Sequence, residues 1–318
     1  NQKQIAEKLG VSIAVVSRVL SGKAKDIGIA EKTIALVEKT AKEMNYVSNA
    51  AARALKGKST QTIGVVVYDF KDPFFGIIVE KLHNLAYKND YSLLLVGFKN
   101  RKPTQRDLSP FQKFALDGII AVGSDSDESW LKSFQHLPCA RIGYCSGKPA
   151  FNEIGTDETQ GYDELLKHCV TRDLKNITFL GNSSFVHTRR KETLENLCKK
   201  YGVKLKSFTA KEPFEDSFQC GATLAKKCLT PKTTIICAND RMAMGAIQTC
   251  LKGNLSIPED IKVVGFDDIP QAEQFIPPLT TIRQPINSLT ESAFNYIVKK
   301  DSNRRSLFQS KLILRSTF

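Results

Sequence analysis

Polar and aromatic side chains occur directly after several apolar, strand-like runs of this 318-residue chain. Asp69, Asp72, Phe74 and Phe75 follow the first run, and Ser124, Asp157, Arg190, Asn239 and Asp267 follow later runs. In two-lobed α/β domains the ligand binds in the cleft at the carboxyl ends of the strands, where loops of both lobes converge. We therefore expect Asp72, Phe74 and the five later residues to line a site for a small molecule.

These side chains combine one cation, several carboxylates, an amide and aromatic faces. The combination suits a polyol, sugar, sugar phosphate or nucleoside-like molecule. Arg190 would clamp a pair of hydroxyls or a carboxylate. Asp157, Asn239 and Asp267 would exchange hydrogen bonds with hydroxyls, and Phe74 would stack on a ring face.

Simpler structural roles are open for some of these residues. Asp157 could cap a helix that begins near Gln160. Arg190 could form a surface salt bridge, because basic residues flank it on both sides. For the neighbouring Asp240 and Asp268 we expect helix N-caps rather than ligand contacts.

The elements that would position this site begin near residue 62, where apolar runs alternate with amphipathic helices in the βαβ pattern of a parallel sheet. The first series predicts strands 63–67, 92–96, 118–122 and 139–142 with helices 75–89, 105–116 and 127–135. The second series starts with strand 153–155 and continues with strands 177–180, 203–207, 234–237 and 262–266 and helices 159–170, 188–201, 217–228 and 241–252. Two Rossmann-like lobes are implied. Neither contains GxGxxG or a P-loop, so the sequence does not support a nucleotide-binding version of the fold.

Three short helices are predicted before this region, over residues 2–9, 12–20 and 30–44. Gly10, Val11 and Ser12 supply a turn and a serine that can cap the second helix. The arrangement suits a helix-turn-helix, whose second helix enters the major groove; a three-helix unit that binds no nucleic acid is the alternative. Residues 1–58 hold eleven Lys or Arg against five acids, and so carry +6 of the chain's net +13. This excess favours a polyanionic partner.

Motifs along the whole chain resemble one family. Residues 11–22 read VSIAVVSRVLSG and look like the recognition helix of the lactose-repressor (galactose-repressor) family, whose pattern is VSxxTVSRVLNG. Similar segments follow at 45–46, 49–55, 72–75, 117–120, 238–240, 263–268 and 277–285. The resemblance implies an all-α helix-turn-helix domain (1–46), a hinge helix and linker (47–60), and a two-lobed α/β domain (61–318) with parallel Rossmann-like sheets, like the type I periplasmic binding proteins. Its N-lobe would span about 61–156 and 285–312, and its C-lobe about 157–284 and 313–318.

The resemblance also assigns DNA contacts to the second helix. Ile13, Ala14 and Arg18 fall where the family reads base edges, and Ser12 and Ser17 fall where it contacts phosphates. A guanidinium can bond O6 and N7 of a guanine, so Arg18 is expected to read a base directly. Ile13 and Ala14 offer apolar contact, which would favour a thymine methyl group or a fit of shape.

Residues of the hinge and of the cleft receive roles in the same way. Leu55 occupies the position of the leucine that the family inserts into the minor groove, and Asn49, Ala52 and Arg53 would line that groove; a plain polar linker over 48–58 is the alternative. In the cleft, the resemblance assigns effector contact to Arg190, Asn239 and Asp267, and also to Phe74 and Asp157.

Composition favours the cytoplasm. The eight cysteines form no CxxC pair and lie mostly in apolar or helical contexts, which indicates free thiols in a reducing compartment. No window approaches the roughly 18 apolar residues of a membrane span. The N-terminal residues lack an export pattern, but the chain lacks an initiator Met, so a signal removed upstream stays an open alternative.

Together these features predict a ligand-responsive, sequence-specific DNA-binding transcription regulator that acts as a repressor. A homodimer would hold two heads on a palindromic double-stranded operator, and an effector between the lobes would change its DNA affinity. An exported sugar-binding protein would share the two-lobed fold but lack residues 1–58. An enzyme would need a Ser/His/Asp arrangement or a metal-ligand spacing, and neither is visible. We predict no catalytic residue, cofactor, metal site or membrane partner.

Overall fold

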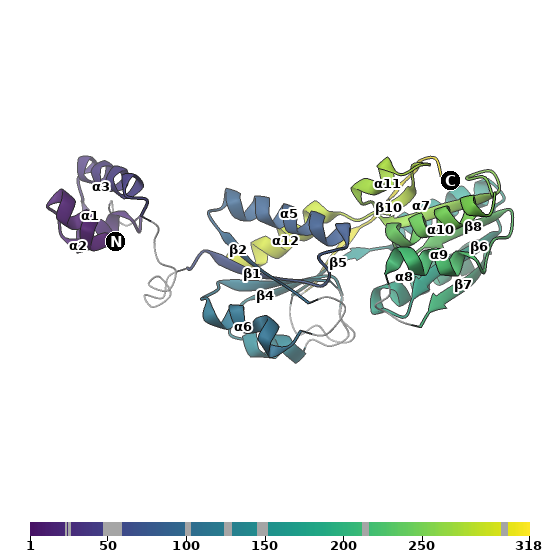
Figure 1. Ribbon diagram of the computed structural model, residues 1–318, viewed down its shortest axis with the longest axis horizontal. Coiled ribbons are helices and arrows are strands. Elements are labelled where there is room, and N and C mark those ends of the chain that lie inside the picture. Colours follow the sequence, from purple (N-terminus) through teal and green to yellow (C-terminus); the bar gives the residue numbers. More distant parts are fainter. Residues whose placement is uncertain are drawn as a thin grey trace. The chain divides into compact units, whose positions relative to one another are not determined.

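The computed structural model describes residues 1–22, 24, 27–46, 59–98, 103–123, 129–144, 152–211, 216–299 and 305–318. The chain forms two compact units, Asn1–Thr60 and Gln61–Phe318. Figure 1 shows a helical first unit and a second unit built from two sheets with helices on their faces.

The first unit packs three helices around a small apolar core. α1 (Gln2–Leu9) begins at Asn1, whose side chain accepts a hydrogen bond from the Gln4 amide, and ends at Gly10, whose φ of 65° requires the freedom of glycine. α2 (Ile13–Val19) and α3 (Glu31–Glu43) complete the unit. Their apolar stripes meet at buried Ile5, Val16 and Val37. The three helices predicted from the sequence are therefore confirmed.

The second unit contains two six-stranded sheets. In the first, the order is β11 (Arg305–Gln309), β5 (Asn152–Asp157), β4 (Cys139–Ile142), β3 (Gly118–Val122), β1 (Thr62–Val67) and β2 (Ser92–Gly97), with every pair parallel. In the second, the order is β12 (Lys311–Ile313), β10 (Thr280–Arg283), β9 (Ile261–Asp267), β8 (Thr233–Cys237), β6 (Asn176–Asn182) and β7 (Lys204–Ala210). Only the β10–β12 pair of this sheet is antiparallel. We call the first sheet with the helices that cover it the N-lobe, and the second sheet with its helices the C-lobe.

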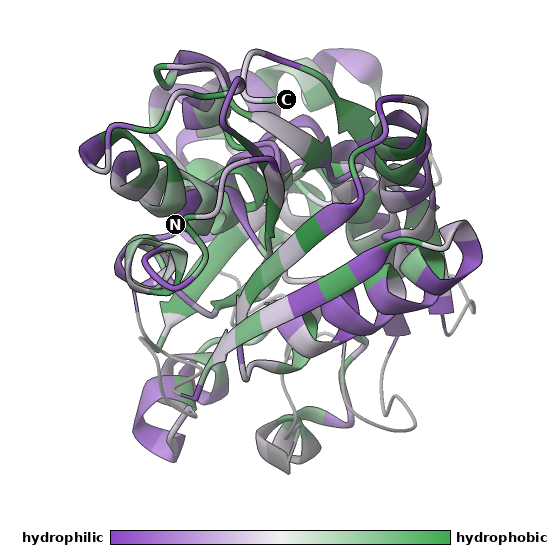
Figure 2. Ribbon diagram, turned by 90° about the vertical axis from the view of Figure 1, so that its right-hand side faces the viewer, coloured by the Kyte–Doolittle hydropathy of each residue, from purple (hydrophilic) through white to green (hydrophobic). Residues whose placement is uncertain are grey.

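Helices cover both faces of each sheet. The N-lobe holds α5 (Pro73–Lys88), α6 (Gln105–Lys113), the 3₁₀ helix η2 (Ser129–Phe134) and α12 (Ile286–Lys299). The C-lobe holds α7 (Thr159–Thr171), α8 (Phe185–Tyr201), α9 (Ser217–Ala225), α10 (Asp240–Lys252) and α11 (Pro270–Gln274). In the N-lobe, Val65 faces α5 and α12 while its neighbour Val66 faces α6, because successive strand residues point to opposite faces. At the C-lobe edge, β7 exposes Lys204, Lys206 and Ser207 and half-buries Leu205 and Phe208. Figure 2 shows hydrophilic and hydrophobic residues mixed along the strands on this side.

The described chain crosses between the lobes three times, after β5, between β10 and α12, and between β11 and β12. Hydrogen bonds join these crossings. The Thr156 hydroxyl donates to Gln284 Oε1 at 2.6 Å, and the Ser310 hydroxyl donates to the Asp157 carbonyl at 2.9 Å. The three crossings are therefore linked to one another by hydrogen bonds at the boundary between the lobes.

The structure corrects three details of the sequence analysis. Strand 153–155 closes the N-lobe sheet instead of opening the second series, since β5 pairs with β4 and β11. The helix predicted over 127–135 is the short 3₁₀ segment η2, and the strands β10, β11 and β12 were not predicted. The prediction that the cysteines form no disulfide is confirmed for the seven described cysteines, all of them buried. Within the described residues, no helix is long and apolar enough to cross a membrane.

Candidate functional site

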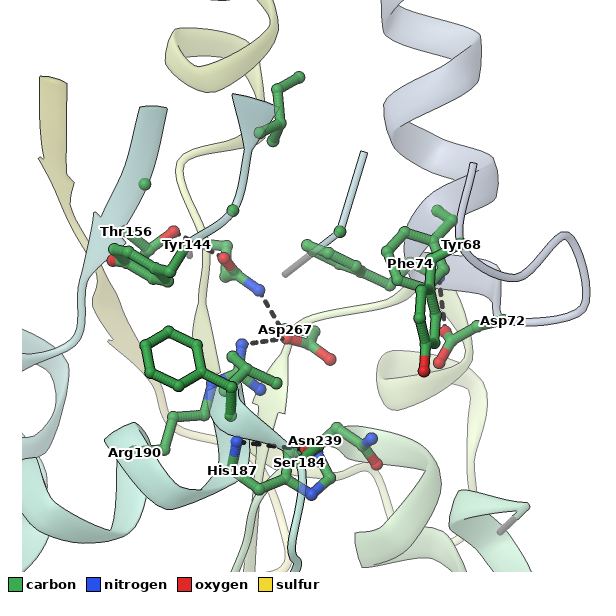
Figure 3. Close-up of a pocket in the computed structure, with 18 of the residues that line it drawn as sticks. Tyr68, Asp72, Phe74, Tyr144, Thr156, Ser184, His187, Arg190, Asn239 and Asp267 are labelled. Carbon is green, nitrogen blue, oxygen red and sulfur yellow. Dashed lines mark hydrogen bonds and ion pairs between the residues drawn. The ribbon is translucent and has the colours of Figure 1, made fainter. Parts of the chain in front are cut away.

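A cavity lies between the two lobes, at the carboxyl ends of strands from both sheets. It encloses about 1050 Å³, open mouth included. Tyr68 follows β1, Tyr144 follows β4, Asn239 follows β8, and Asp267 ends β9; all of them line it. Of the residues predicted from the sequence, the structure brings Asp72, Phe74, Arg190, Asn239 and Asp267 together here (Figure 3).

Asp267 lies where the polar groups of the site meet. Its carboxylate oxygen Oδ1 accepts hydrogen bonds from Arg190 Nη2 at 3.1 Å and from Gln284 Nε2 at 2.6 Å (Figure 3). The backbone φ angle of Asp267 is 114°, a conformation that side-chain-bearing residues rarely adopt. Burial raises the pKa of this carboxyl to about 6, although nearby Arg190 lowers it. Asp267 is thus a buried acceptor held in one orientation.

Arg190 is fixed from several sides. It is only 5 % exposed and lies on the second turn of α8. One Nη donates to the Ala238 carbonyl and the other to Asp267, while the guanidinium lies 3.7 Å from the ring centre of Phe266. This burial excludes the surface salt bridge that the sequence left open, and it leaves a preorganised donor at the base of the cavity.

Asn239 begins α10 and performs a structural role at the same time. Its Oδ1 accepts a hydrogen bond from the Met242 amide at 2.8 Å, and its Nδ2 donates to the Ser217 hydroxyl at 3.1 Å. The expectation of an N-cap at Asp240 is therefore wrong, because Asn239 is the cap. Asp240 is fully buried and instead accepts from the Ile269 amide at 2.8 Å and the Thr281 hydroxyl at 2.5 Å.

Asp268 does not cap a helix either, because its carboxylate pairs with Arg283 at 2.5 Å and Arg315 at 2.8 Å. Both arginines belong to the second sheet and its C-terminal extension. Asp268 therefore ties the end of β9 to its neighbours and leaves Asp267 to face the cavity.

Aromatic side chains form the N-lobe wall of the cavity. Asp72 caps α5 by accepting from the Phe74 amide at 3.0 Å, and Pro73 is the first helical residue. Phe74 contacts Phe75 edge to face at 5.6 Å between ring centres, and Phe75 lies 6.2 Å from Tyr68. Burial raises the pKa of the Asp72 carboxyl. The wall thus presents ring faces with one carboxylate at their edge.

Two predicted residues are not part of this described site. Ser124 lies outside the described residues. Asp157 does not line the cavity: its Oδ1 accepts from the Thr159 amide at 3.0 Å, at the start of α7. The reason is the period of two along a strand, since its neighbour Thr156 points into the cavity and Asp157 must point away. Asp157 therefore bonds to the first residue of α7, but the N-cap of that helix is Glu158, so the capping role that the sequence had left as its alternative is not filled by Asp157.

The sequence analysis missed a second polar cluster beside the cavity. Arg189 stacks 3.9 Å from the ring centre of Tyr144 and lies 3.4 Å from Glu158. Glu158 is 1 % exposed, and burial raises its pKa although Arg189 lowers it. Tyr144 belongs to the N-lobe and Arg189 to the C-lobe, so this cluster joins the lobes. None of these residues follows a motif that could have predicted the contact.

His187 also lines the cavity and was not predicted. Its Nδ1 accepts a hydrogen bond from the Asn182 amide at 3.1 Å. Burial, together with the nearby Arg190 cation, lowers its pKa to about 3. The ring is therefore neutral, with Nδ1 unprotonated and its other nitrogen carrying the hydrogen. Among the described residues, no group of three or more His, Cys, Asp or Glu could hold a metal ion.

In the first unit, the residues predicted to contact DNA lie on α2. Ser12 caps the helix by accepting from the Val15 amide at 3.2 Å. Ser12, Ile13, Ala14 and Arg18 are exposed, whereas Ser17 is half-buried. The hinge residues Asn49, Ala52, Arg53 and Leu55 lie outside the described residues. The helix therefore offers one cation, a large apolar side chain (Ile13) and a small one (Ala14) on its outer surface.

Comparisons with known proteins agree with this architecture. Residues 2–49 match the model of the lacI family of bacterial regulatory proteins, and residues 166–317 match a periplasmic binding protein-like domain. The chain is 30% identical over 330 residues to the HTH-type transcriptional repressor PurR of Mannheimia succiniciproducens, covering 99% of this chain and 97% of the relative. It is also 30% identical over 329 residues to the repressor of that name from Photobacterium profundum, with the same coverage.

Solved structures share the fold. The Lac repressor dimer bound to operator and the anti-inducer ONPF superposes with a TM-score of 0.82 at 22% identity, covering 98% of this chain and 97% of that one. A complex of the transcriptional regulator CelR with cellobiose gives a TM-score of 0.67 at 18% identity, covering 100% and 99%. The predicted fold class, a helix-turn-helix domain followed by a two-lobed α/β domain with parallel sheets, is confirmed.

Proposed function

Since the chain belongs to the LacI family of bacterial regulatory proteins, and is therefore a ligand-responsive, DNA-binding transcription regulator, we propose that it is a homodimeric repressor whose effector binds in the cavity between its lobes. The observation that carries the proposal is the joining of Arg190, Asp267 and Gln284 with groups of the N-lobe around one cavity. A molecule held by both lobes must favour one arrangement of them, which is the condition for linkage to DNA affinity.

Each of the two units has its own function in this proposal. Residues 1–46 read the operator through α2, residues 47–60 form the hinge, and residues 61–318 bind the effector and dimerise. Arg18 reads a guanine, Ser12 and Ser17 contact phosphates, and Ile13 with Ala14 contacts bases through apolar groups. Asn49, Ala52, Arg53 and Leu55 act in the minor groove of a palindromic operator.

In the effector domain, Asp72, Phe74, Arg190, Asn239 and Asp267 contact a sugar or nucleoside-like molecule. The proposal is supported by the lining of the cavity, where polar side chains lie on one side and aromatic rings on the other. This combination binds a ring that bears hydroxyl groups. Ser124 is proposed as a further contact on its position in the sequence alone. We place the protein in the cytoplasm, where the target DNA lies and where free thiols persist.

The protein binds its effector without chemical conversion. A general base needs a pKa near the working pH and a free proton-accepting atom. The pKa of His187 is lowered to about 3 and its Nδ1 is occupied by a backbone amide. The pKa of Asp267, about 6, would suit a base, but two donors hold its Oδ1 in one orientation. Together with the similarity to transcriptional repressors, this favours a binding site over a reaction centre.

In-vitro selection of randomised duplex DNA at near-physiological salt tests the DNA-binding half of the proposal. We expect a palindrome with a flexible central step, and Arg18→Ala should abolish its enrichment. Lys204→Ala, which removes an exposed cation of β7 in the other unit, is the matched control and should select the same palindrome. An unenriched pool bound only at low salt would contradict sequence-specific recognition, because it would reflect charge alone.

A further inference from the structure

The described side chains that line the cavity carry more negative than positive charge. Three carboxylates, those of Asp69, Asp72 and Asp267, line it. Among the described lining residues, Arg190 is the only Lys or Arg. An anionic ligand would therefore meet an excess of like charge in a partly buried space, where such repulsion is screened less than in water.

The positive charge of Arg190 is already neutralised by a carboxylate of the protein. Arg190 pairs with Asp267 at 3.1 Å, donates to the Ala238 carbonyl, and stacks on Phe266. A free guanidinium can grip two oxygens of a phosphate side by side. Here two of its N–H groups are committed to protein acceptors, and a phosphate would have to compete with the carboxylate that holds it. The nearby Arg189 and Arg241 are likewise paired, with Glu158 and Asp216.

The helix N-termini at the cavity do not replace the missing positive charge. α5, α8 and α10 all begin there, and free N–H groups at such ends can bind phosphate. At each of the three ends the capping side chain already takes one of these N–H groups: Asp72 accepts from the Phe74 amide, Ser184 from the His187 amide, and Asn239 from the Met242 amide. At α5 the cap is a carboxylate, which places a negative charge where an anion would bind.

The remaining surface suits a ring without charge. Tyr68, Phe74 and Phe75 form a continuous group of rings. Figure 3 shows Tyr68 and Phe74 on one side of the cavity and Arg190 on the other. An aromatic wall binds the flat face of a sugar or base, while Arg190, Asp267 and Gln284 supply donors and acceptors to its edge. We propose that the effector is an uncharged sugar or nucleoside and that the cavity excludes phosphorylated forms; this rests on the cavity being the effector site.

Matched pairs of compounds test the inference. Calorimetric titration of the full chain would compare ribose with ribose 5-phosphate, glucose with glucose 6-phosphate, and adenosine with AMP. We expect the unphosphorylated member of a binding pair to bind at least about tenfold more tightly. Asp72→Asn keeps an N-cap on α5 but removes one charge, so it should narrow that ratio several-fold. Asp173→Asn removes a carboxylate remote from the cavity, at a φ of 54° that asparagine tolerates, and should leave the ratio unchanged.

Operator affinity, measured in the same samples, separates this inference from the proposed function. A phosphorylated member that binds as tightly as its partner and still changes operator affinity would overturn the inference while the proposed function stands. If Asp72→Asn shows the same ratio of affinities for the unphosphorylated and phosphorylated compounds as the parent, the charge of Asp72 is not what excludes phosphate. If no compound binds and none changes operator affinity, both the inference and the proposed function are overturned.

Discussion

Asp267 combines backbone strain with buried charge, and its neighbours hold it in that state. Its φ of 114° and the φ of 58° at Asp268 are rare for residues with side chains, and such conformations cost about 1–3 kcal/mol each. The two ion pairs of Asp268 and the two hydrogen bonds to Asp267 fix the turn. The strain directs one carboxylate into the cavity while the next points into the protein.

The stability of the effector domain should depend on the ionisation of Asp267. Its native pKa of about 6 lies above the ordinary 3.8, so the native state holds the proton more tightly than the unfolded state. This contribution is therefore fully present below pH 4 and is lost as pH rises from 4 to 6. Its size is on the order of 3 kcal/mol. Urea unfolding of the parent and of Asp267→Asn at pH 4–7 isolates the effect as a difference.

The comparison must be differential because His187 acts in the opposite direction. Its lowered pKa costs native stability as pH falls below 6.5, since only the unfolded ring gains a proton. Arg190 and Asp72 also face Asp267 and respectively lower and raise its pKa. If the difference between parent and Asp267→Asn stays constant from pH 4 to pH 7, Asp267 titrates normally and the assignment is wrong.

Arg18 gives a second prediction at this scale. Arg18→Lys keeps the positive charge but removes the planar pair of donors that fits guanine O6 and N7. We expect discrimination at one operator position to fall by about 1–3 kcal/mol, while the salt dependence of binding is preserved. Binding assays on single-base operator variants at several salt concentrations would measure both. A uniform loss at all positions would mean that Arg18 contacts phosphate.

Single residues of the site were predictable where one rule sufficed. Arg190, Asn239 and Asp267 follow strand ends and are in the cavity, as the topology of parallel sheets requires. Asp157 follows a strand too, but the alternation along β5 was unknown without its register. Tyr144 and Arg189 meet only because the two lobes approach one another, and no local pattern encodes that approach.

Among the elements, α9 and α10 cross at a pair of glycines. A Cβ on Gly221 would overlap the Met242 carbonyl, and one on Gly245 would overlap the Phe218 carbonyl, both of them backbone atoms that cannot move aside. Asn239 starts α10 at the cavity, so this crossing also positions a residue of the site. The helix backbones therefore approach as closely as they do because neither carries a side chain there.

Gly245→Ala should accordingly destabilise the effector domain by roughly 1–3 kcal/mol despite the higher helix propensity of alanine. Gly76→Ala in α5 is the matched control, because a Cβ there meets nothing within 4 Å. It should be neutral or stabilise the domain by up to about 1 kcal/mol. Thermal unfolding of both variants compares the two helices. Equal effects of the two substitutions would show that propensity, and not the crossing, governs Gly245.

Long elements were predictable, and short ones at the lobe boundary were not. The alternation of apolar runs and amphipathic stretches extends over enough residues in α8 and α10 to show its period. β10 and β12 have four and three residues, too few for a period to be recognised. These strands also owe their existence to pairing with partners distant in the sequence, such as Thr281 with Ile313.

At the scale of the whole effector domain, the contacts that hold the lobes together include the three crossings, the Arg189 cluster, and Phe74 and Ile77 of α5, which pack against the core of the C-lobe. The crossings are covalent and are joined at Thr156 and Ser310, so they fix a hinge. The Arg189 cluster lies beside the first crossing, because Glu158 directly follows β5, and it has Tyr144 in one lobe and the guanidinium in the other. It can form only in arrangements that bring the lobes together, so it should bias the equilibrium toward closure.

Arg189→Gln tests this bias. The substitution removes the stacking on Tyr144 and leaves Glu158, which is 1 % exposed, without its cation. We expect a larger radius of gyration of the effector-free protein in solution and a loss of roughly 1–2 kcal/mol in stability. Adding Glu158→Gln should restore much of the stability, because no unpaired charge then remains, but not the compactness.

The matched control is Arg172→Gln. Arg172 stacks 5.0 Å from the ring centre of Phe318, and both belong to the C-lobe. It removes the same kind of contact without touching the boundary between lobes, so stability should fall slightly while the radius of gyration stays that of the parent. If Arg189→Gln and Arg172→Gln change the scattering profile equally, the Arg189 cluster stabilises only its own surroundings, and the crossings and the packing of α5 against the C-lobe set how the lobes are arranged.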